Sequence, residues 1–457
     1  MDLTAKGTRK LELTANRGAA SLAGILGRGP KGEDGSNVLP TDTAIAAKIN
    51  DPASATKAAL DVSMAAQTAP FARLGADFYT GPYVAAMGDS ITALNGSTTG
   101  NQQADTHHNW LYCYAGGRLR WARTAAQAGY TLAQIRDTQL PLILAQNPLP
   151  DAVLLLGGTN DVGSSTFDLA ASMAVWDDIH NQLRKQGIRL IPCTIPPRGD
   201  STTANQKADK FNAALRNRAA NLGLDLVDYH KVLVDPATGG YKAGYSISDN
   251  LHPSFLGGKE MGKYAAMVLA PRFPDVRPYL VEHALDSTDL LAGQGLFRVD
   301  TNGDGIADGW SSFSAAAYSI VTDADGTKWQ RLTRDSSASG ALLQKSVSSV
   351  VAPGDVIEVS ARVQAGGWDA VVTPTSTVNW TFSCTTTGTA ATDSASPAYA
   401  MHCDAADGVL TQRITVGAGA TGQIKANLQI SNAPASGSVW VQFANVTVRN
   451  LTTLGVL

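Results

Sequence analysis

Short apolar runs alternate with helical sequence between residues 81 and 272, and this alternation limits the fold more than any other feature of the chain. The runs cover residues 83–87, 152–156, 190–195 and 224–227. The clearest helical pattern covers 167–187 and closes on a glycine, as helices commonly do. Buried strands separated by helices favour a parallel sheet with helices on both faces. We therefore expect residues 81–272 to form an α/β domain with a doubly wound parallel sheet.

The sequence after residue 290 changes to a two-residue period, with apolar and polar residues alternating at 356–365 and 438–451. This pattern predicts an antiparallel β-sandwich, of a carbohydrate-binding type, over 290–457, joined by a linker at 273–289. Five tryptophans fall here, and for each one we favour core packing over a sugar-stacking surface. They are Trp310, Trp329, Trp368, Trp380 and Trp440.

The first 80 residues contain a short Gly-X-Y tract and two narrow apolar stripes at helical spacing. Gly29, Gly32 and Gly35 fall at every third position, which fits either a collagen-like triple helix or a flexible linker. Helices with stripes as narrow as those in 41–66 commonly pack against copies of themselves. We expect residues 1–80 to form an attachment and trimerisation segment, which makes the protein a homotrimer.

Composition excludes several classes of protein. The 457 residues are 44% hydrophobic and 16% charged, as in a globular chain, and the net charge of −3 gives no footprint for nucleic acid. No apolar stretch approaches the roughly 18 residues that a membrane span needs. The beginning of the chain does not resemble a secretory signal peptide.

The four cysteines do not form a metal-binding pattern. Cys113 and Cys193 lie in apolar sequence and are expected in the core. Cys384 and Cys403 lie on either side of a polar loop, and both a disulfide and two free thiols fit the sequence.

Ser90 ends the first apolar run, in the sequence "MGDSIT". One interpretation is that Asp89 and Ser90 cap the next helix. The other is that Ser90 is a nucleophile, because the carboxyl edge of such a sheet is where α/β proteins place their chemistry.

Further polar residues follow other strands of the same domain. Asn160 follows the second long apolar run, Gly129 lies between that run and Ser90, and Asp249 stands three residues before His252 in "SDNLHP". Each alone fits a turn or a surface position. Their order on strand-end loops of one domain is hard to assign to turns alone.

The combination of "GDSIT", "GGTND" and "DNLHP" resembles the SGNH hydrolases, also called GDSL-type esterases and lipases. The resemblance implies a flavodoxin-like fold, Ser90 as nucleophile, and His252 as base oriented by Asp249. It also implies an oxyanion hole formed by Ser90, Gly129 and Asn160. Glutamine and alanine precede Gly129, where the family commonly has an asparagine.

The chemistry of these residue types agrees with that role. A serine hydroxyl becomes a good nucleophile when an imidazole removes its proton, and a carboxylate fixes the imidazole in one tautomer. Backbone amides and an asparagine amide can stabilise the oxyanion that develops. The expected reaction is ester hydrolysis without a catalytic cofactor.

The segment "DTNGDGIADGW" has the alternating oxygen ligands of a calcium loop. Ser311 occupies the place of the bidentate glutamate that an EF-hand would have. A structural calcium site and a plain polar turn are both open interpretations. The ligands of such a site would be Asp300, Asn302, Asp304 and Asp308.

We expect an esterase that deacetylates cell-envelope polysaccharide. The tract at 29–35 resembles the stalks of bacteriophage tail fibres and receptor-binding proteins, so we expect a place in the virion, with other tail proteins and a host surface glycan as partners. The polar residues His107, His108 and Asn109 favour a small acyl group over a lipid. A host-binding adhesin on a hydrolase fold and a lipid esterase are the alternatives.

Overall fold

The computed structural model describes residues 81–93, 106–122, 124–274, 288–314, 316–336, 340–348, 351–371, 378–388, 399–418 and 420–455. The chain divides into Met1–Gly75 and Ala76–Leu457, and every described residue belongs to the second unit. The predicted trimerisation segment at 1–80 therefore lies outside the described residues.

The α/β part is built on a parallel sheet with strand order β2-β1-β4-β5. A short strand, β3, continues the edge begun by β2 and also pairs with β1. The strands are β1 (Tyr83–Gly88), β2 (Arg120–Trp121), β3 (Ala125–Ala126), β4 (Ala152–Leu156) and β5 (Arg189–Pro192). This arrangement fits the predicted flavodoxin-like α/β fold.

The sequence predicts a fourth strand at 224–227, and this prediction is wrong. Only Val227 pairs, in a single parallel bridge with Cys193. The strand predicted at 190–195 likewise ends at Pro192. Pro192 and Pro196 lie on either side of the bridge between Cys193 and Val227. Because proline has no amide hydrogen, neither residue can donate the backbone hydrogen bond that would extend this bridge into a longer strand pair.

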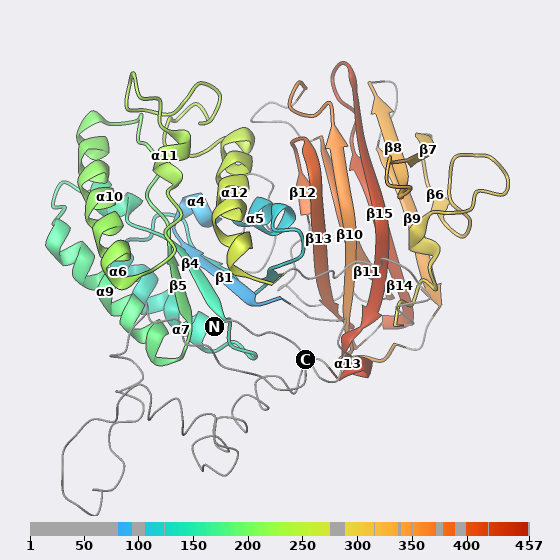
Figure 1. Ribbon diagram of the computed structural model, residues 1–457, viewed down its shortest axis with the longest axis horizontal. Helices are drawn as coiled ribbons and strands as arrows, with labels where there is room; N and C mark the ends of the chain where they lie inside the picture. Colours follow the sequence, from blue (N-terminus) through green and yellow to red (C-terminus); the bar gives the residue numbers. More distant parts are fainter. Residues whose placement is uncertain are drawn as a thin grey trace, which may run out of the picture. The chain divides into compact units, whose positions relative to one another are not determined.

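Helices cover both faces of this sheet (Figure 1). Each face of the sheet has its own hydrophobic core, and alternate residues of β1 point into one or the other. Ala85 and Met87 pack with α9 (Leu169–Lys185) and α10 (Thr202–Leu222), whereas Val84 and Ala86 face the opposite side. That side is covered by α5 (His107–Tyr114), α11 (Tyr229–Leu233) and α12 (Phe255–Leu269). The remaining helices are α4 (Ser90–Ala93), α6 (Leu132–Gln134), η1 (Ile135–Gln139), α7 (Leu140–Leu144), α8 (Thr159–Gly163), η2 (Ala270–Arg272), η3 (Gln294–Leu296) and α13 (Leu451–Leu454).

Two antiparallel five-stranded sheets follow, consistent with the predicted β-sandwich. Their orders are β13-β10-β15-β8-β7 and β12-β11-β14-β9-β6. The strands are β6 (Ser311–Ser312), β7 (Ala317–Thr322), β8 (Lys328–Asp335), β9 (Ala341–Ser348), β10 (Val356–Gly366), β11 (Asn379–Gly388), β12 (Tyr399–Met401), β13 (Ala405–Thr415), β14 (Ala420–Ser431) and β15 (Ser438–Asn450).

The core of the sandwich includes residues of the α/β part. Trp110 of α5 meets Trp380 of β11 edge to face, with ring centroids 6.3 Å apart. Phe255, the first residue of α12, stacks on His402 with centroids 4.1 Å apart. A Cβ at Gly408 would lie 2.3 Å from the sulfur of Cys113, so β13 packs directly on α5. We call this set of contacts the shared core.

Tryptophans and cysteines of the sandwich are mostly interior. Four of its five tryptophans are buried, and the fifth, Trp440, is half-buried with the Arg331 guanidinium 4.3 Å from its ring centroid. Core packing, rather than an exposed tryptophan pair, is therefore observed. Cys384 and Cys403 are both buried and free, as are Cys113 and Cys193.

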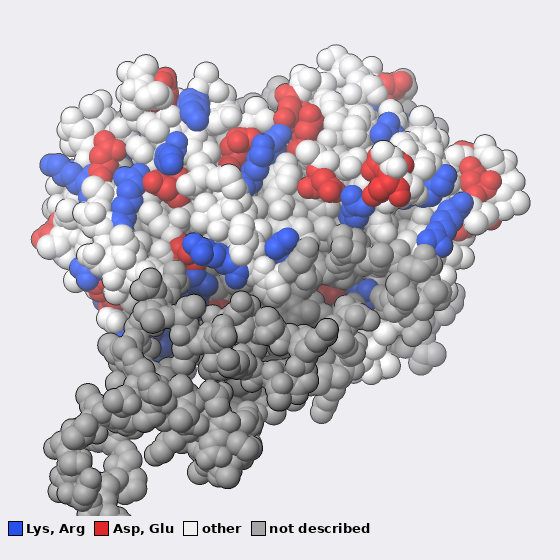
Figure 2. All heavy atoms as spheres, viewed as in Figure 1, with Lys and Arg blue, Asp and Glu red and all other residues white. Residues whose placement is uncertain are grey.

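The face of the molecule in Figure 2 carries acidic and basic side chains interspersed, without a large field of one sign. Among the described helices, none combines the length and apolar character needed to cross a bilayer.

Candidate active site

Ser90 lies where β1 turns into the short helix α4. A Cβ on Gly88, two residues before it, would lie 2.5 Å from the carbonyl oxygen of Leu156, so only glycine lets β1 end this close to β4. The side chain of Asp89 accepts a hydrogen bond from the Ile91 amide at 3.0 Å. The capping role thus belongs to Asp89, and the Ser90 hydroxyl points to a different partner.

That partner is His252. Its Nε2 lies 2.8 Å from Ser90 Oγ, and its Nδ1 lies 2.7 Å from Asp249 Oδ2. An ionised carboxylate only accepts hydrogen bonds, so Nδ1 carries the ring proton and Nε2 accepts from the serine hydroxyl. Three residues that are up to 162 positions apart in the chain form one hydrogen-bonded relay.

Asp249 is also held by the backbone of its own loop. Its Oδ1 accepts from the amides of Leu251 at 2.9 Å and His252 at 3.0 Å. Partial burial raises the pKa of Asp249, but hydrogen bonds from the backbone and ring of His252 and from Leu251 outweigh this effect and leave the pKa below its usual value. The carboxylate is therefore ionised at neutral pH and keeps the imidazole in one orientation.

Asn160 and Gly129 come together at the neighbouring strand end. Asn160 is the second residue of α8, and its Nδ2 donates to the carbonyl of Tyr130 at 2.8 Å. Tyr130 directly follows Gly129, which has a φ of +80° that favours glycine. One hydrogen of the Asn160 amide thus links α8 to the loop of Gly129.

Asp89 is a completely buried carboxyl group beside Ser90. Burial raises its pKa to about 6, and interactions with the Ile91 amide, Thr159 and His252 lower it only in part. Since Thr159 precedes Asn160, Asp89 brings the loop of Ser90 next to the loop of the predicted oxyanion donor.

His107, His108 and Asn109 do not line the site, contrary to the prediction from their polarity. All three are buried in α5. The His107 ring bonds to Thr92 Oγ1 at 3.2 Å and to the hydroxyl of Tyr229 at 2.8 Å, and burial holds its pKa well below the usual value. His107 is therefore a neutral, buried residue that contacts α4 through Thr92.

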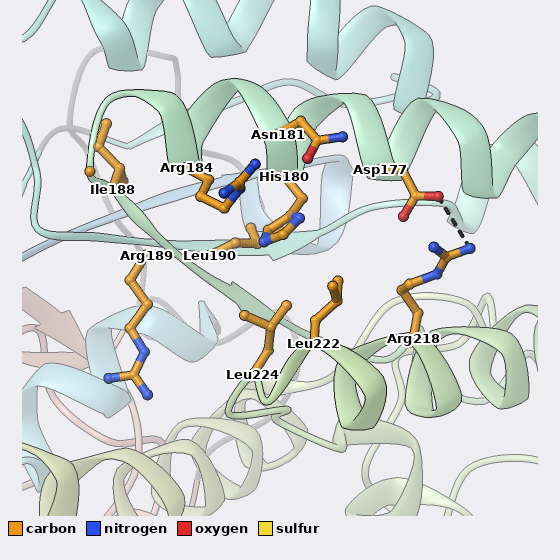
Figure 3. Close-up of a pocket in the computed structure, with 11 residues that line it drawn as sticks. Asp177, His180, Asn181, Arg184, Ile188, Arg189, Leu190, Arg218, Leu222 and Leu224 are labelled. Atoms are coloured by element: carbon orange, nitrogen blue, oxygen red, sulfur yellow. Dashed lines mark ion pairs between the residues drawn. The ribbon is translucent and has the colours of Figure 1, made fainter. Parts of the chain in front are cut away.

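A separate hollow of about 610 Å³ lies between α9 and α10, next to the start of β5 (Figure 3). Leu190, Leu222 and Leu224 contribute apolar walls, and an ion pair of Asp177 with Arg218 at 3.2 Å crosses one end. The start of β5 is at the amino edge of the sheet, whereas Ser90 follows the carboxyl end of β1. None of the predicted catalytic residues lines this hollow.

The Asp-rich loop of the sandwich uses its carboxylates for local hydrogen bonds. Asp300 accepts from the amides of Gly303 and Gly305, and Asp308 accepts from Thr301. Asp304 bonds to the side chain of Asn302. Within the described part of the chain, no three His, Cys, Asp or Glu side chains are grouped to hold a metal ion. Structural calcium at this loop stays a prediction.

Arg198 and Tyr241 are two site residues that the sequence did not reveal. Arg198 follows β5 and donates to the carbonyl of Thr159, and the Tyr241 hydroxyl donates to the carbonyl of Leu251 beside His252. Arg198 could have been found by the rule that identified Ser90, because it also lies in a loop at the carboxyl end of a strand. No local pattern distinguishes Tyr241.

Residues 86–259 match the GDSL-like lipase/acylhydrolase family, so the chain carries a hydrolase domain of this family. No curated protein matches the chain. Solved structures of low identity are similar to part of the chain. One is a GDSL-like lipase from Bacteroides thetaiotaomicron, at 18% identity and a TM-score of 0.34, over 42% of this chain and 87% of that one.

Two further similar structures are esterases. A catalytic mutant of an acetylxylan esterase from Geobacillus stearothermophilus is 18% identical, with a TM-score of 0.35, over 44% of this chain and 99% of that one. An acetyl xylan esterase is 21% identical, with a TM-score of 0.34, over 41% of this chain and 99% of that one.

Proposed function

We propose that this protein is a serine ester hydrolase whose nucleophile is Ser90. The observation that carries the proposal is the relay from Ser90 through His252 to Asp249, with distances of 2.8 and 2.7 Å, on a domain of a hydrolase family. A relay of this geometry activates a hydroxyl for acyl transfer at neutral pH.

The reaction follows from the atoms in place. Ser90 Oγ attacks the ester carbonyl as its proton moves to His252 Nε2, and the imidazolium is stabilised by Asp249. The imidazolium then gives this proton to the leaving alcohol, which leaves an acyl group on Ser90. A water molecule attacks the acyl carbon as His252 accepts its proton. The imidazolium then returns this proton to Ser90 Oγ as the bond to the acyl carbon breaks, and the carboxylic acid departs.

The oxyanion hole in this proposal consists of the backbone amides of Ser90 and Gly129 and the second hydrogen of the Asn160 amide. Losing one such donor typically costs about 3 to 4 kcal/mol of transition-state stabilisation. The bond from Asn160 to Tyr130 supports the assignment, because it brings the Gly129 loop and the asparagine together in advance of the reaction.

The substrate we propose is a small acyl ester, such as an acetyl group, on a cell-envelope polysaccharide. The site is open to solvent: the side chains of His252 and Asp249 are 21% and 42% exposed. A long acyl chain would require walls that bury many methylenes at about 0.8 kcal/mol each, whereas an acetyl group on a hydrated polymer does not.

The setting we propose is a phage tail fibre or receptor-binding protein, trimeric through residues 1–80. The support is the Gly-X-Y tract with Gly29, Gly32 and Gly35, beside the narrow helical stripes. The partners in this proposal are other tail proteins and a host glycan. If the chain acts only as an adhesin, Ser90→Ala leaves binding to host cells unchanged and the wild type shows no hydrolysis.

The test of the nucleophile combines activity and labelling. A serine-reactive fluorophosphonate should modify Ser90, and Ser90→Ala should lose both the label and the hydrolysis of an aryl acetate while unfolding at the same temperature. The control is Ser165→Ala, which changes an exposed serine of the same domain. A Ser90→Ala variant that retains a tenth of the wild-type rate contradicts the assignment.

The acyl group is tested with acetyl, butyryl, octanoyl and palmitoyl esters of one alcohol. We expect kcat/KM to fall as the chain lengthens. A maximum at eight carbons or more would favour a lipid esterase instead.

A further inference from the structure

Arg198 is a buried arginine in the loop after β5, at the same sheet edge as Ser90. Its Nη1 donates a hydrogen bond to the backbone carbonyl of Thr159 at 2.6 Å. Thr159 is the first residue of α8 and the immediate neighbour of Asn160. The guanidinium therefore holds the backbone of the loop that presents the predicted oxyanion donor.

The rest of the guanidinium is fixed by Asp200. Nε and Nη2 donate to its two carboxylate oxygens at 3.0 and 2.6 Å, a bidentate pair that sets the orientation of the plane. The backbone amide of Arg198 donates to the side chain of Asn205 on α10 at 2.7 Å. The arginine is thus held at both its backbone and its head group.

The residue after Arg198 connects to the loop of the general base. The Gly199 amide donates to the carbonyl of Asn250 at 2.9 Å. A Cβ at Gly199 would lie 3.0 Å from the Cβ of Asn250, so the two loops are in close contact. Asn250 stands directly after Asp249 and has a left-handed φ of 53°.

The charges around Arg198 also favour this position. The carboxylate of Asp200 is repelled by that of Asp249. The ion pair with Arg198 outweighs that repulsion and holds the pKa of Asp200 below its usual value. Space for the guanidinium comes from Gly163, where a Cβ would lie 2.9 Å from Nη1.

We propose that Arg198 is a positioning residue that fixes the loop carrying Asn160 relative to the loop carrying Asp249 and His252. The proposal rests on the serine hydrolase function proposed above. Arg198 does not contact substrate in this role, and it acts through the placement of Asn160.

The test is a double-mutant cycle with Arg198→Met and Asn160→Ala. We expect Arg198→Met to lower kcat by about tenfold to a hundredfold, with KM changed less than about threefold, because the transition state loses an aligned donor. In the Asn160→Ala background the same substitution should lower kcat less than about threefold, because groups that act as a unit are not additive. Equal effects in both backgrounds, or none in either, overturn the proposal.

The matched control is Arg216→Met. Arg216 also forms a two-bond pair with an aspartate, Asp228, at 2.8 and 2.9 Å, but it contacts neither loop. We expect it to leave kcat within about twofold of wild type. Should Arg198→Met fail to fold, Arg198→Lys preserves the charge and can still reach Thr159, and an intermediate loss of kcat with the same coupling to Asn160 is expected.

A readout that needs no activity separates this proposal from the proposed function. Amide hydrogen exchange of peptides covering 156–165 and 246–254 should accelerate in Arg198→Met and not in Arg216→Met. Unchanged exchange in both peptides rejects the positioning role, even if Ser90 is shown to be the nucleophile. Absence of wild-type hydrolysis and labelling, with accelerated exchange, rejects the hydrolase function and retains the link between the loops.

Discussion

Asp89 places a buried carboxyl group directly beside Ser90, and its pKa of about 6 makes the free energy of unfolding depend on pH. The folded protein binds this proton more tightly than the unfolded chain. The resulting stabilisation is present below the unfolded pKa and is lost as the pH rises through about 6. Ionisation of Asp89 is therefore a cost that the folded protein bears at neutral pH.

Asp89→Asn should remove this dependence. We expect the free energy of unfolding of wild type, relative to Asp89→Asn, to fall by about 2 kcal/mol between about pH 4.5 and about pH 7.5. Urea denaturation of both proteins at the two pH values measures it, and the comparison cancels groups that titrate alike in both. A difference that is independent of pH would show that Asp89 titrates normally.

Residues at strand ends could be predicted from the sequence, and residues that pack behind them could not. Ser90 follows a recognisable strand and His252 precedes a recognisable helix, so their positions in the sequence pattern reveal them. Arg198 has the same kind of position, but its burial depends on Gly163 and on the carbonyl of Thr159, which the fold brings to it. His107 looked polar and accessible because the sequence does not show which elements cover α5.

At the scale of elements, the crossing of α5 and α12 joins the two halves of the relay. A Cβ at Gly262 would lie 2.2 Å from the Cβ of Trp110 and 2.5 Å from the carbonyl of His107. Helix α5 supports α4 through His107, and α12 begins three residues after His252. We therefore expect the distance between these two helices to set the distance between Ser90 and His252.

Gly262→Ala should separate the helices, because the nearest atoms include backbone that cannot turn away. We expect a loss of at least about 1 to 3 kcal/mol of stability, the usual cost of overpacking, and a fall in kcat of at least about tenfold. Thermal unfolding and steady-state kinetics measure both. Lys263→Ala, an exposed neighbour on α12, is the control. Wild-type kcat in Gly262→Ala would show that the crossing does not set the relay.

Elements with a long, regular pattern were predicted best. The α9 helix, predicted at 167–187, is observed at Leu169–Lys185 with Asp168 as its N-cap. The prediction of a strand at 224–227 was wrong because apolar character alone does not provide a partner strand. Only Val227 pairs, with Cys193. The prediction of the sandwich succeeded because a two-residue period that continues over about ten residues is typical of strands and incompatible with the 3.6-residue period of a helix.

At the scale of the whole molecule, the assembly prediction concerns the first 80 residues. We expect the full chain to be a trimer and a chain beginning at residue 81 to be a monomer, because the Gly-X-Y tract and the helical stripes both favour association. The shorter chain retains every described residue and should fold. Light scattering during size-exclusion chromatography gives both masses. A monomeric full chain would refute the prediction, and a trimeric short chain would place the contacts in the later domains.

The shared core has a consequence for the order in which the protein matures on the ribosome. The α/β part is synthesised first, and the side chains of Trp110, Cys113 and Phe255 have their packing partners in the sandwich, which is made later. The strand at the centre of one sandwich sheet, β15, is the last strand of the described chain. Nascent chains that already carry Ser90, Asp249 and His252 therefore still expose an apolar surface until β15 has been synthesised.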